Sequence, residues 1–343
     1  MAYISFQPKD YFNTVLYTGT GSTQNITGVG FQPDWVWNKA RNASEDHSTI
    51  DAVRGVTKSI YPSDPAAEQT LSTGLTAFGS DGYTVGGDGY WGYNGRTYAS
   101  WNWKANGQGS SNTDGSINTT YTSANTTSGF SISQYTGAGS TSTVGHGLGV
   151  APKVIIIKCT SNASTPWEFY HESIGNNKKL NLNSTAAEAS SGYMNNTSPT
   201  SSVFTVVDDA DIGGSGRTYI AYCFAPVKGF SAMGSYTGNG NADGAFIYTG
   251  FKPAYVLIKR TDATENWVIN DNKQSPYNPT HDFLLADVAS IPTAGGTPID
   301  LLSNGFKIRT TSVYSNASSG TYIYMAFAEA PLVSSNGVPA VAR

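Results

Sequence analysis

The densest group of acidic side chains in the sequence is formed by Asp208, Asp209 and Asp211. Carboxylate oxygens are the usual ligands of calcium, so this group is the strongest candidate for a metal site. Its spacing differs from that of an EF-hand loop, and no counterpart occurs in the last third of the chain. We therefore expect an acidic loop here, with no bound metal and no cofactor.

Residues that could catalyse hydrolysis are present without a diagnostic spacing. A glycosidase needs two carboxyl groups about 5–10 Å apart, a distance that spacing in the sequence does not fix. The candidates for such a pair are Asp34, Glu45, Glu168, Glu265 and Asp271. The chain has no Gly-x-Ser-x-Gly segment for a serine nucleophile, and its four histidines are scattered. We expect a protein without enzymatic activity.

Aromatic residues are the better candidates for a binding surface. Trp91, Tyr93 and Tyr98 fall in the glycine-rich stretch GGDGYWGYNGRTY. Tyrosine and tryptophan offer rigid contact area with a polar end, which suits the recognition of both proteins and sugars. We expect these three residues to form an exposed aromatic platform; the alternative is that they only wall a glycine-rich loop.

The composition favours an all-β protein. Of 343 residues, 38 are glycine, 13% are charged and 12% are aromatic. Few charges and many turn-forming and aromatic residues are typical of strands joined by tight turns. The net charge of −4 without a basic cluster argues against a nucleic-acid partner. The chain has neither a long apolar run nor a secretory signal, so we expect no insertion into a membrane.

Three sets of markers recur along the chain in the same order, which indicates an internal repeat. The segment Tyr-Thr-Gly-x-Gly begins at Tyr17, Tyr135 and Tyr236. An apolar run follows each time and ends at Lys39, Lys158 or Lys259. An aromatic strand then begins at Thr97, Thr218 or Thr321. We predict three homologous units.

The strand patterns within each unit predict a tandem of three β-sandwiches of jelly-roll type with little helix. The predicted divisions are repeat 1 at 1–105, a Gly/Ser/Thr/Asn-rich linker at 106–128, repeat 2 at 129–227, and repeat 3 with a C-terminal tail at 228–343. The linker has almost no large apolar residue, so we expect it to be flexible or loosely attached.

Several polar positions are shared by the predicted repeats. We expect the three lysines that end the apolar runs to carry their ammonium groups to water. His171 stands where the other repeats have Asp51 and Asp271, which predicts a common hydrogen-bonding position at the surface. The two cysteines, Cys159 and Cys223, are too few for a disulfide framework, although a single bridge between them stays open.

The repeated markers, with the strand TYIYMAFA near the C-terminus and the ending AFAEAPLVSSNGVPAVAR, resemble a repeated β-domain of tailed-bacteriophage structural proteins, notably of marine and cyanobacterial phages. The resemblance covers almost the whole chain and supplies no catalytic residues. It implies a component of the virion, made in the host cytoplasm and displayed on the particle.

Three functions are compatible with this resemblance. The first is a component of the tail fibre or tail tip that binds a host-surface glycan or protein. The second is a capsid decoration or tail-assembly protein whose contacts are purely architectural. The third is a polysaccharide depolymerase. The expected partners are other virion proteins and further copies of the chain, since three alike units also permit a near-threefold arrangement.

Overall fold

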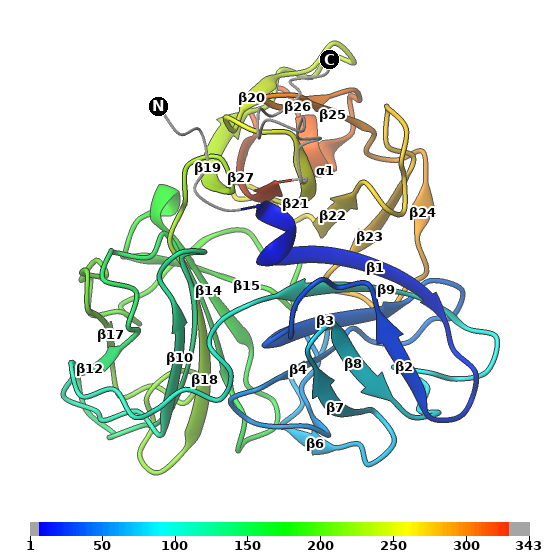
Figure 1. Ribbon diagram of the computed structural model, residues 1–343. Coiled ribbons are helices and arrows are strands. Elements are labelled where there is room, and N and C mark those ends of the chain that lie inside the picture. The colour runs from blue at the N-terminus through cyan, green and yellow to red at the C-terminus, as the bar shows by residue number, and fades with distance from the viewer. Residues whose placement is uncertain (1–6, 329–343) are drawn as a thin grey trace.

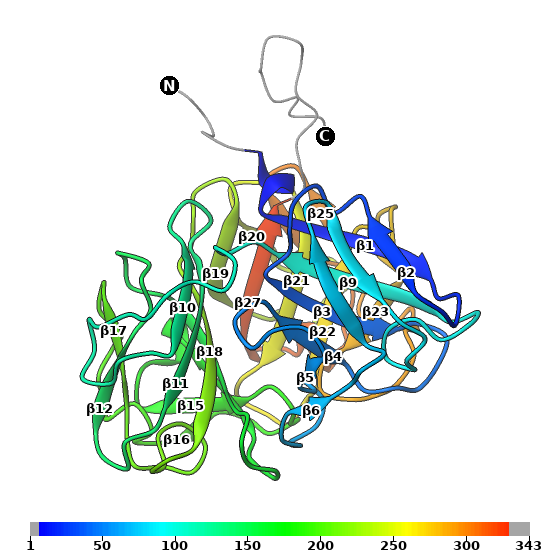
Figure 2. The same cartoon turned by 60° about the horizontal axis from the view of Figure 1, so that its bottom comes forward.

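The computed structural model describes residues 7–328, which consist almost entirely of strands and loops (Figures 1 and 2). Helix within these residues is limited to short pieces, namely η1 (Pro8–Asp10), η2 (Glu172–Ile174) and α1 (Val313–Asn316). No helix in this part of the chain is long and apolar enough to cross a membrane. The all-β class predicted from the composition is confirmed.

We use unit 1, unit 2 and unit 3 for residues 7–105, 106–227 and 228–328, and each unit contains one main sheet. The main sheet of unit 1 joins β1 (Phe12–Thr18), β9 (Thr97–Trp103), β3 (Trp35–Ala40) and β4 (Ser48–Asp51). The main sheet of unit 2 joins β10 (Tyr121–Asn125), β11 (Phe130–Thr136), β18 (Thr218–Phe224), β13 (Val154–Cys159), β14 (Trp167–His171), β15 (Lys178–Asn181) and β16 (Ala189–Ser190). The main sheet of unit 3 joins β19 (Ser231–Thr237), β27 (Thr321–Ala328), β21 (Pro253–Arg260), β22 (Trp267–Asp271), β23 (Asp282–Leu285) and β24 (Thr293–Ala294).

A smaller sheet covers the outer face of each main sheet, which makes every unit a β-sandwich. In unit 1 it joins β2 (Gln24–Thr27), β8 (Gly82–Val85) and β7 (Leu75–Gly79), and a separate hairpin pairs β5 (Lys58–Ser59) with β6 (Gln69–Thr70). In unit 2 it joins β12 (Ser142–Gly145) and β17 (Val203–Val206). In unit 3 it joins β20 (Phe246–Tyr248), β26 (Gly305–Ile308) and β25 (Ile299–Leu302).

The same local arrangement occurs once in every unit. The first strand of the repeat pairs with the last, and a tyrosine of one stacks on a tyrosine of the other. The stacked pairs are Tyr17–Tyr98, Tyr135–Tyr219 and Tyr236–Tyr322, with ring centroids 5.0, 5.2 and 4.9 Å apart. The first hydroxyl of each pair also donates to a backbone carbonyl, at 2.6, 2.6 and 2.8 Å. This recurrence agrees with a threefold repeat, while the common origin of the units stays a prediction.

The inner faces of the three main sheets pack on one another around a common core (Figure 1). The ring of Trp35 in unit 1 stacks on that of Tyr222 in unit 2, with centroids 4.3 Å apart. Phe12 of unit 1 stacks on Phe327 of unit 3 at 5.1 Å. The units therefore do not follow one another as separate modules, because burial of their inner faces joins them into one body.

Ring nitrogens and backbone carbonyls close the three units into a cycle. One ring at an equivalent position of each unit bonds to a carbonyl of a neighbouring unit. The bonds join Trp167 Nε1 to Tyr61 O (2.8 Å), Trp267 Nε1 to Asn181 O (3.0 Å) and His47 Nε2 to Leu285 O (3.0 Å). His47 Nδ1 accepts from the indole of Trp37 at 2.8 Å, so Nε2 carries the proton and donates. Each unit thus donates to one neighbour and accepts from the other, as in a closed heterologous ring.

The strand-end position shared by Asp51, His171 and Asp271 is fully buried, so the expectation of a surface role was wrong. Asp51 Oδ2 accepts from the hydroxyl of Tyr222 at 2.7 Å, and Asp271 Oδ2 accepts from the indole of Trp101 at 3.1 Å. Both bonds cross a junction between units.

At the third junction, between units 2 and 3, Met325 stands at the position that Tyr222 and Trp101 hold at the other two. A methionine side chain has no proton to donate. His171 is found there in place of an aspartate. Its Nδ1 accepts from the amide of Ser173 at 3.1 Å, and its Nε2 lies 3.3 Å from the carbonyl of Tyr324. Burial lowers the pKa of His171 to about 4, so the ring is neutral at pH 7. A neutral ring avoids the unpaired buried charge that an aspartate would leave here.

The three repeat lysines are also fully buried, so the expected exposure of their ammonium groups was wrong. Each ammonium donates to the carbonyl of a residue at the end of its own strand or in the loop that follows, and that of Lys158 donates also to Thr165 Oγ1. Lys158 Nζ also reaches the carbonyl of Pro65 in unit 1 at 3.1 Å, and Lys259 Nζ reaches that of Thr185 in unit 2 at 2.9 Å. Burial lowers the pKa of Lys39, Lys158 and Lys259 to about 8.

The segment 106–128 was expected to be a loosely attached linker, and the structure contradicts this. Its strand β10 pairs with β11, with Tyr121 opposite Gln134. The amide of Asn106 donates to Ser123 Oγ at 2.8 Å, which folds the segment back on itself. Small polar side chains do not prevent strand pairing here, because the backbone supplies the hydrogen bonds.

Replacing His171 by Asp tests the pairing across the third junction. We expect the free energy of unfolding at pH 7 to fall by about 3 kcal/mol, the typical effect of an unpaired buried charge. Adding Met325→Tyr rebuilds the arrangement of Asp51 and Tyr222 and should restore about 1.5 kcal/mol or more. Urea denaturation measures both effects. A double variant no more stable than His171→Asp alone would contradict the pairing.

The buried lysines make stability depend on pH. Between pH 8 and the ordinary lysine pKa of 10.5 the unfolded chain binds more protons than the folded one, so the free energy of unfolding rises with pH. Above about pH 10 the buried tyrosines, whose pKa is raised, oppose this rise.

In urea denaturation between pH 8 and 10, Lys259→Met should reduce the slope of unfolding free energy by up to about 1.4 kcal/mol per pH unit. Lys39→Met and Lys158→Met should do the same. Wild-type slopes in all three variants would show that these lysines titrate alike in both states.

Candidate functional site

The expected aromatic platform is not exposed as a whole. Trp91 and Tyr98 have no exposed surface, whereas Tyr93 is 52% exposed. Trp91 lies in the outer core of unit 1 beside Tyr83, and the hydroxyl of Tyr98 donates to the carbonyl of Gly89 at 2.8 Å. The glycine-rich loop folds inward and uses two of its rings to close the sandwich. Tyr93 remains at the surface, with the guanidinium of Arg96 4.5 Å from its ring centroid.

The aspartates considered for calcium do not converge. Asp208 is exposed, and Asp209 Oδ1 accepts from the amide of Asp211 at 2.8 Å, which stabilises a turn. Asp211 Oδ2 lies 3.9 Å from the ammonium of Lys179. Nowhere within residues 7–328 do three or more His, Cys, Asp or Glu side chains form a group that could hold a metal ion.

Three of the carboxylates considered for hydrolysis have hydrogen-bond or ion-pair partners within their own units, and Glu265 lies in the loop between β21 and β22. Asp34 Oδ2 accepts from the amide of Ala105 at 2.7 Å, and Glu45 pairs with Arg96 at 2.6 Å. Glu168 is fully buried and 2.7 Å from the ammonium of Lys179, and burial raises its pKa to about 7. Cys159 and Cys223 are buried free thiols, so they form no disulfide.

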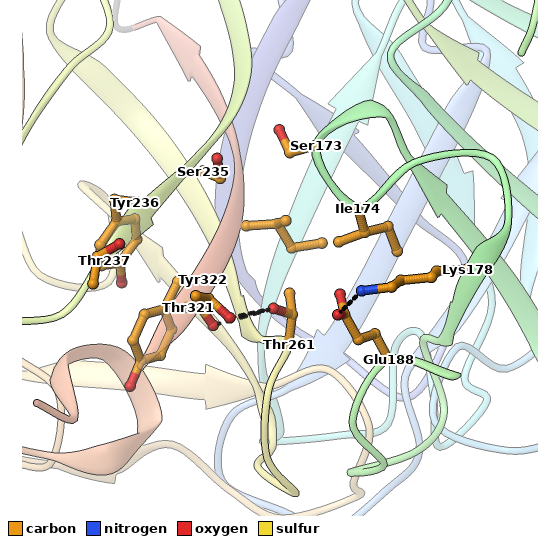
Figure 3. A pocket seen from close by; sticks show the side chains of 11 residues that line it. Ser173, Ile174, Lys178, Glu188, Ser235, Tyr236, Thr237, Thr261, Thr321 and Tyr322 are labelled. Carbon is orange, nitrogen blue, oxygen red and sulfur yellow. Dashed lines mark hydrogen bonds and ion pairs between the residues drawn. The ribbon is translucent and has the colours of Figure 1, made fainter. Parts of the chain in front are cut away.

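A cavity of about 370 Å³ lies at the junction of units 2 and 3 (Figure 3). Lys178 and Glu188 form an ion pair on one side of it, and Tyr236 and Tyr322 stand on the other. Between them Thr261 Oγ1 and Thr321 Oγ1 are hydrogen-bonded at 2.7 Å. The remaining lining residues are Ser173, Ile174, Ser235, Thr237 and Ile323. The lining is thus rich in hydroxyl groups, and its one cation is matched by one anion.

A comparison with unit 1 explains why the unit 2 wall of this cavity is open. Arg54, three residues after Asp51, is buried there and fills the equivalent place. Its guanidinium donates to Asp51 Oδ2 at 2.6 Å, to the carbonyl of Lys58 at 2.8 Å and to Glu68 Oε2 at 3.2 Å. Three residues after His171 the chain has Ile174, which is shorter and makes none of these bonds.

The unit 3 wall is open for a different reason. Strand β19 lies at the edge of its sheet, whereas β11, its counterpart in unit 2, is covered by β10. Ser235 on β19 occupies the position of Gln134 on β11, which is opposite Tyr121 of the covering strand. The free edge leaves Ser235 and Thr237 facing the cavity.

None of the residues that line this cavity was identified as a candidate from the sequence. The relevant signal was the difference between the repeats at one aligned position, where Arg54 and Gln274 correspond to Ile174. The shorter side chain of Ile174 leaves room that the buried arginine fills in unit 1.

A second cavity of about 390 Å³ lies within unit 3, beside the loop that follows β22. Its lining includes Lys252, Lys273 and Tyr277, and the ring of Tyr277 is strongly exposed at 82%. This cavity differs from the first in carrying two lysines and no acidic residue among its lining residues.

No curated protein and no solved structure matches this chain. Residues 7–331 match the model of a family described as a domain of unknown function, DUF7483. Because that match covers nearly the whole sequence, the chain belongs to the DUF7483 family.

Proposed function

We propose that this protein is a non-enzymatic structural component of a tailed-bacteriophage virion, displayed on the tail fibre or tail tip, where it contributes to binding the host surface. The virion part of the proposal is based on the resemblance of the repeated Tyr-Thr-Gly, lysine-ended and aromatic strand motifs to phage structural proteins. The binding part is based on the cavity between units 2 and 3.

The closed ring of units supports a role outside the cell. The first strand of unit 1 and the last strand of unit 3 contact each other through Phe12 and Phe327, so both ends of the described chain are tied into one core. Local opening of such a body exposes buried apolar and polar groups together, which raises its free energy. A protein exposed on a virus particle benefits from this resistance to local unfolding.

The cavity at the junction is the single observation that favours binding over a purely architectural role. It lies at the surface between two units, and its hydroxyl and charged groups can contact a polar ligand. Beside unit 1 the equivalent place is occupied by the buried side chain of Arg54.

The near-threefold ring favours a second candidate, a capsid decoration protein. Three alike units in a cycle could match a threefold or sixfold site of a capsid. Within residues 7–328, however, strand β10 has no counterpart in units 1 and 3, so this part of the ring is not threefold symmetric. We therefore rank the tail location first.

Antibody labelling of intact particles tests the location. We expect gold-labelled antibody to bind at the tail, and purified protein to bind host cells and slow the adsorption of particles to them. Labelling spread over the capsid would favour decoration instead. Particles that carry no label at either place would contradict both, and release of sugar from host capsule by the purified protein would contradict a non-enzymatic role.

A further inference from the structure

We infer that the cavity between units 2 and 3 binds a neutral monosaccharide unit of a host-surface glycan. This inference rests on the proposed function and names the ligand class of its binding site. Three properties of the cavity lead to it, namely its charge, its hydrogen-bonding groups and its apolar floor.

The charge of the lining selects a neutral ligand. Lys178 and Glu188 are the charged residues that line the cavity, and they are paired with each other. An anionic ligand would have to compete with Glu188 for the ammonium, and a cationic one would have to compete with Lys178 for the carboxylate. Their side chains are 38% and 22% exposed, so water screens the pair in part, and separating the two groups would still lose a modest favourable interaction.

The hydrogen-bonding groups suit a ligand with several hydroxyls. Ser235 and Thr237 alternate along the free edge of β19, Ser173 comes from η2, and Thr321 lies at the start of β27. A hydroxyl both donates and accepts, as does each hydroxyl of a sugar, so either partner can adjust its proton to the other. Lys178 adds a group that can only donate a hydrogen bond, and Glu188 adds one that can only accept.

The floor of the cavity adds a small apolar surface. Ile174 and Ile323 contribute aliphatic carbon, and both belong to or pack against the central core. One face of a pyranose ring carries mainly C–H groups, which can lie on such a surface while the ring hydroxyls reach the rim. A volume of about 370 Å³ is near the lower end of ligand sites, which suits one sugar unit rather than a long chain.

Titration of the purified full-length chain with free sugars tests this inference directly. We expect glucose, galactose or mannose to bind with a dissociation constant on the order of 1 mM, the affinity of a small open site. Glucuronic acid and sialic acid should bind more weakly than the neutral sugars. Chemical-shift changes in NMR spectra or calorimetry would give the affinities.

Two pairs of variants locate the site. Ser235→Trp should fill the cavity and Lys178→Met should remove its ion pair, and each should weaken sugar binding by about tenfold or more. The matched control for Ser235→Trp is Leu16→Trp, because Leu16 holds the equivalent position on edge strand β1. The matched control for Lys178→Met is Lys58→Met, because Lys58 holds the equivalent position on hairpin β5–β6. The controls should bind sugar as the wild type does, and melting temperatures would confirm that all four variants fold.

Absence of neutral-sugar binding at concentrations of about 50 mM would overturn the inference. Sugar binding that is unchanged in Ser235→Trp would also overturn it. A preference for acidic sugars that is lost in Lys273→Met would overturn it too, because the binding would then belong to the second cavity. If the protein binds no sugar, but antibody against it still labels the tail and the purified protein still binds host cells, the ligand class is wrong and the proposed function stands. If the purified protein also fails to bind host cells and the antibody labels no part of the particle, the ligand class and the proposed function are both wrong.

Discussion

The structure depends on one constraint, namely that the inner face of each main sheet is buried against the other two units. A strand in such a sheet is apolar on both faces, and any polar group on it must find a partner away from water. The partners come from the neighbouring unit. Trp167, Trp267 and His47 bond to carbonyls across the junctions, and the buried lysines do the same at two of them.

Because each junction must satisfy its own polar groups, a change on one side is matched by a change on the other. Asp51 faces Tyr222, whereas His171 occurs where the opposite residue is Met325. The same logic produced the cavity. Unit 1 has Asp51 paired with Arg54, whereas unit 2 has the neutral His171 followed three residues later by Ile174, which does not fill the space that Arg54 takes in unit 1. The candidate binding site is thus a by-product of how one junction satisfies its buried groups.

The all-β class and the recurring strands could be predicted from the sequence, because period-two patterns and turn residues are local signals. The repeat also placed Asp51, His171 and Asp271 at one position. What the sequence could not give was the closure of the ring. A lysine at the end of a strand normally reaches water, but here the ammonium groups of Lys158 and Lys259 meet the carbonyls of Pro65 and Thr185 from the neighbouring unit. The prediction of an aromatic platform was wrong for a separate reason, because the rings of Trp91 and Tyr98 are buried within unit 1 itself.

The contacts that close the ring also bear on how the chain folds. His47 meets the carbonyl of Leu285, and Trp101 meets Asp271, so partners far apart in sequence must find each other. Contacts of such long range make folding slow, because loop-closure entropy is lost before the contacts form. Unit 1 leaves the ribosome first, yet its inner face has no complete partner until β27 has been synthesised. During that interval Trp35, Trp103 and Phe12 expose a broad apolar face, so the nascent chain is most vulnerable to aggregation just before its last strand emerges.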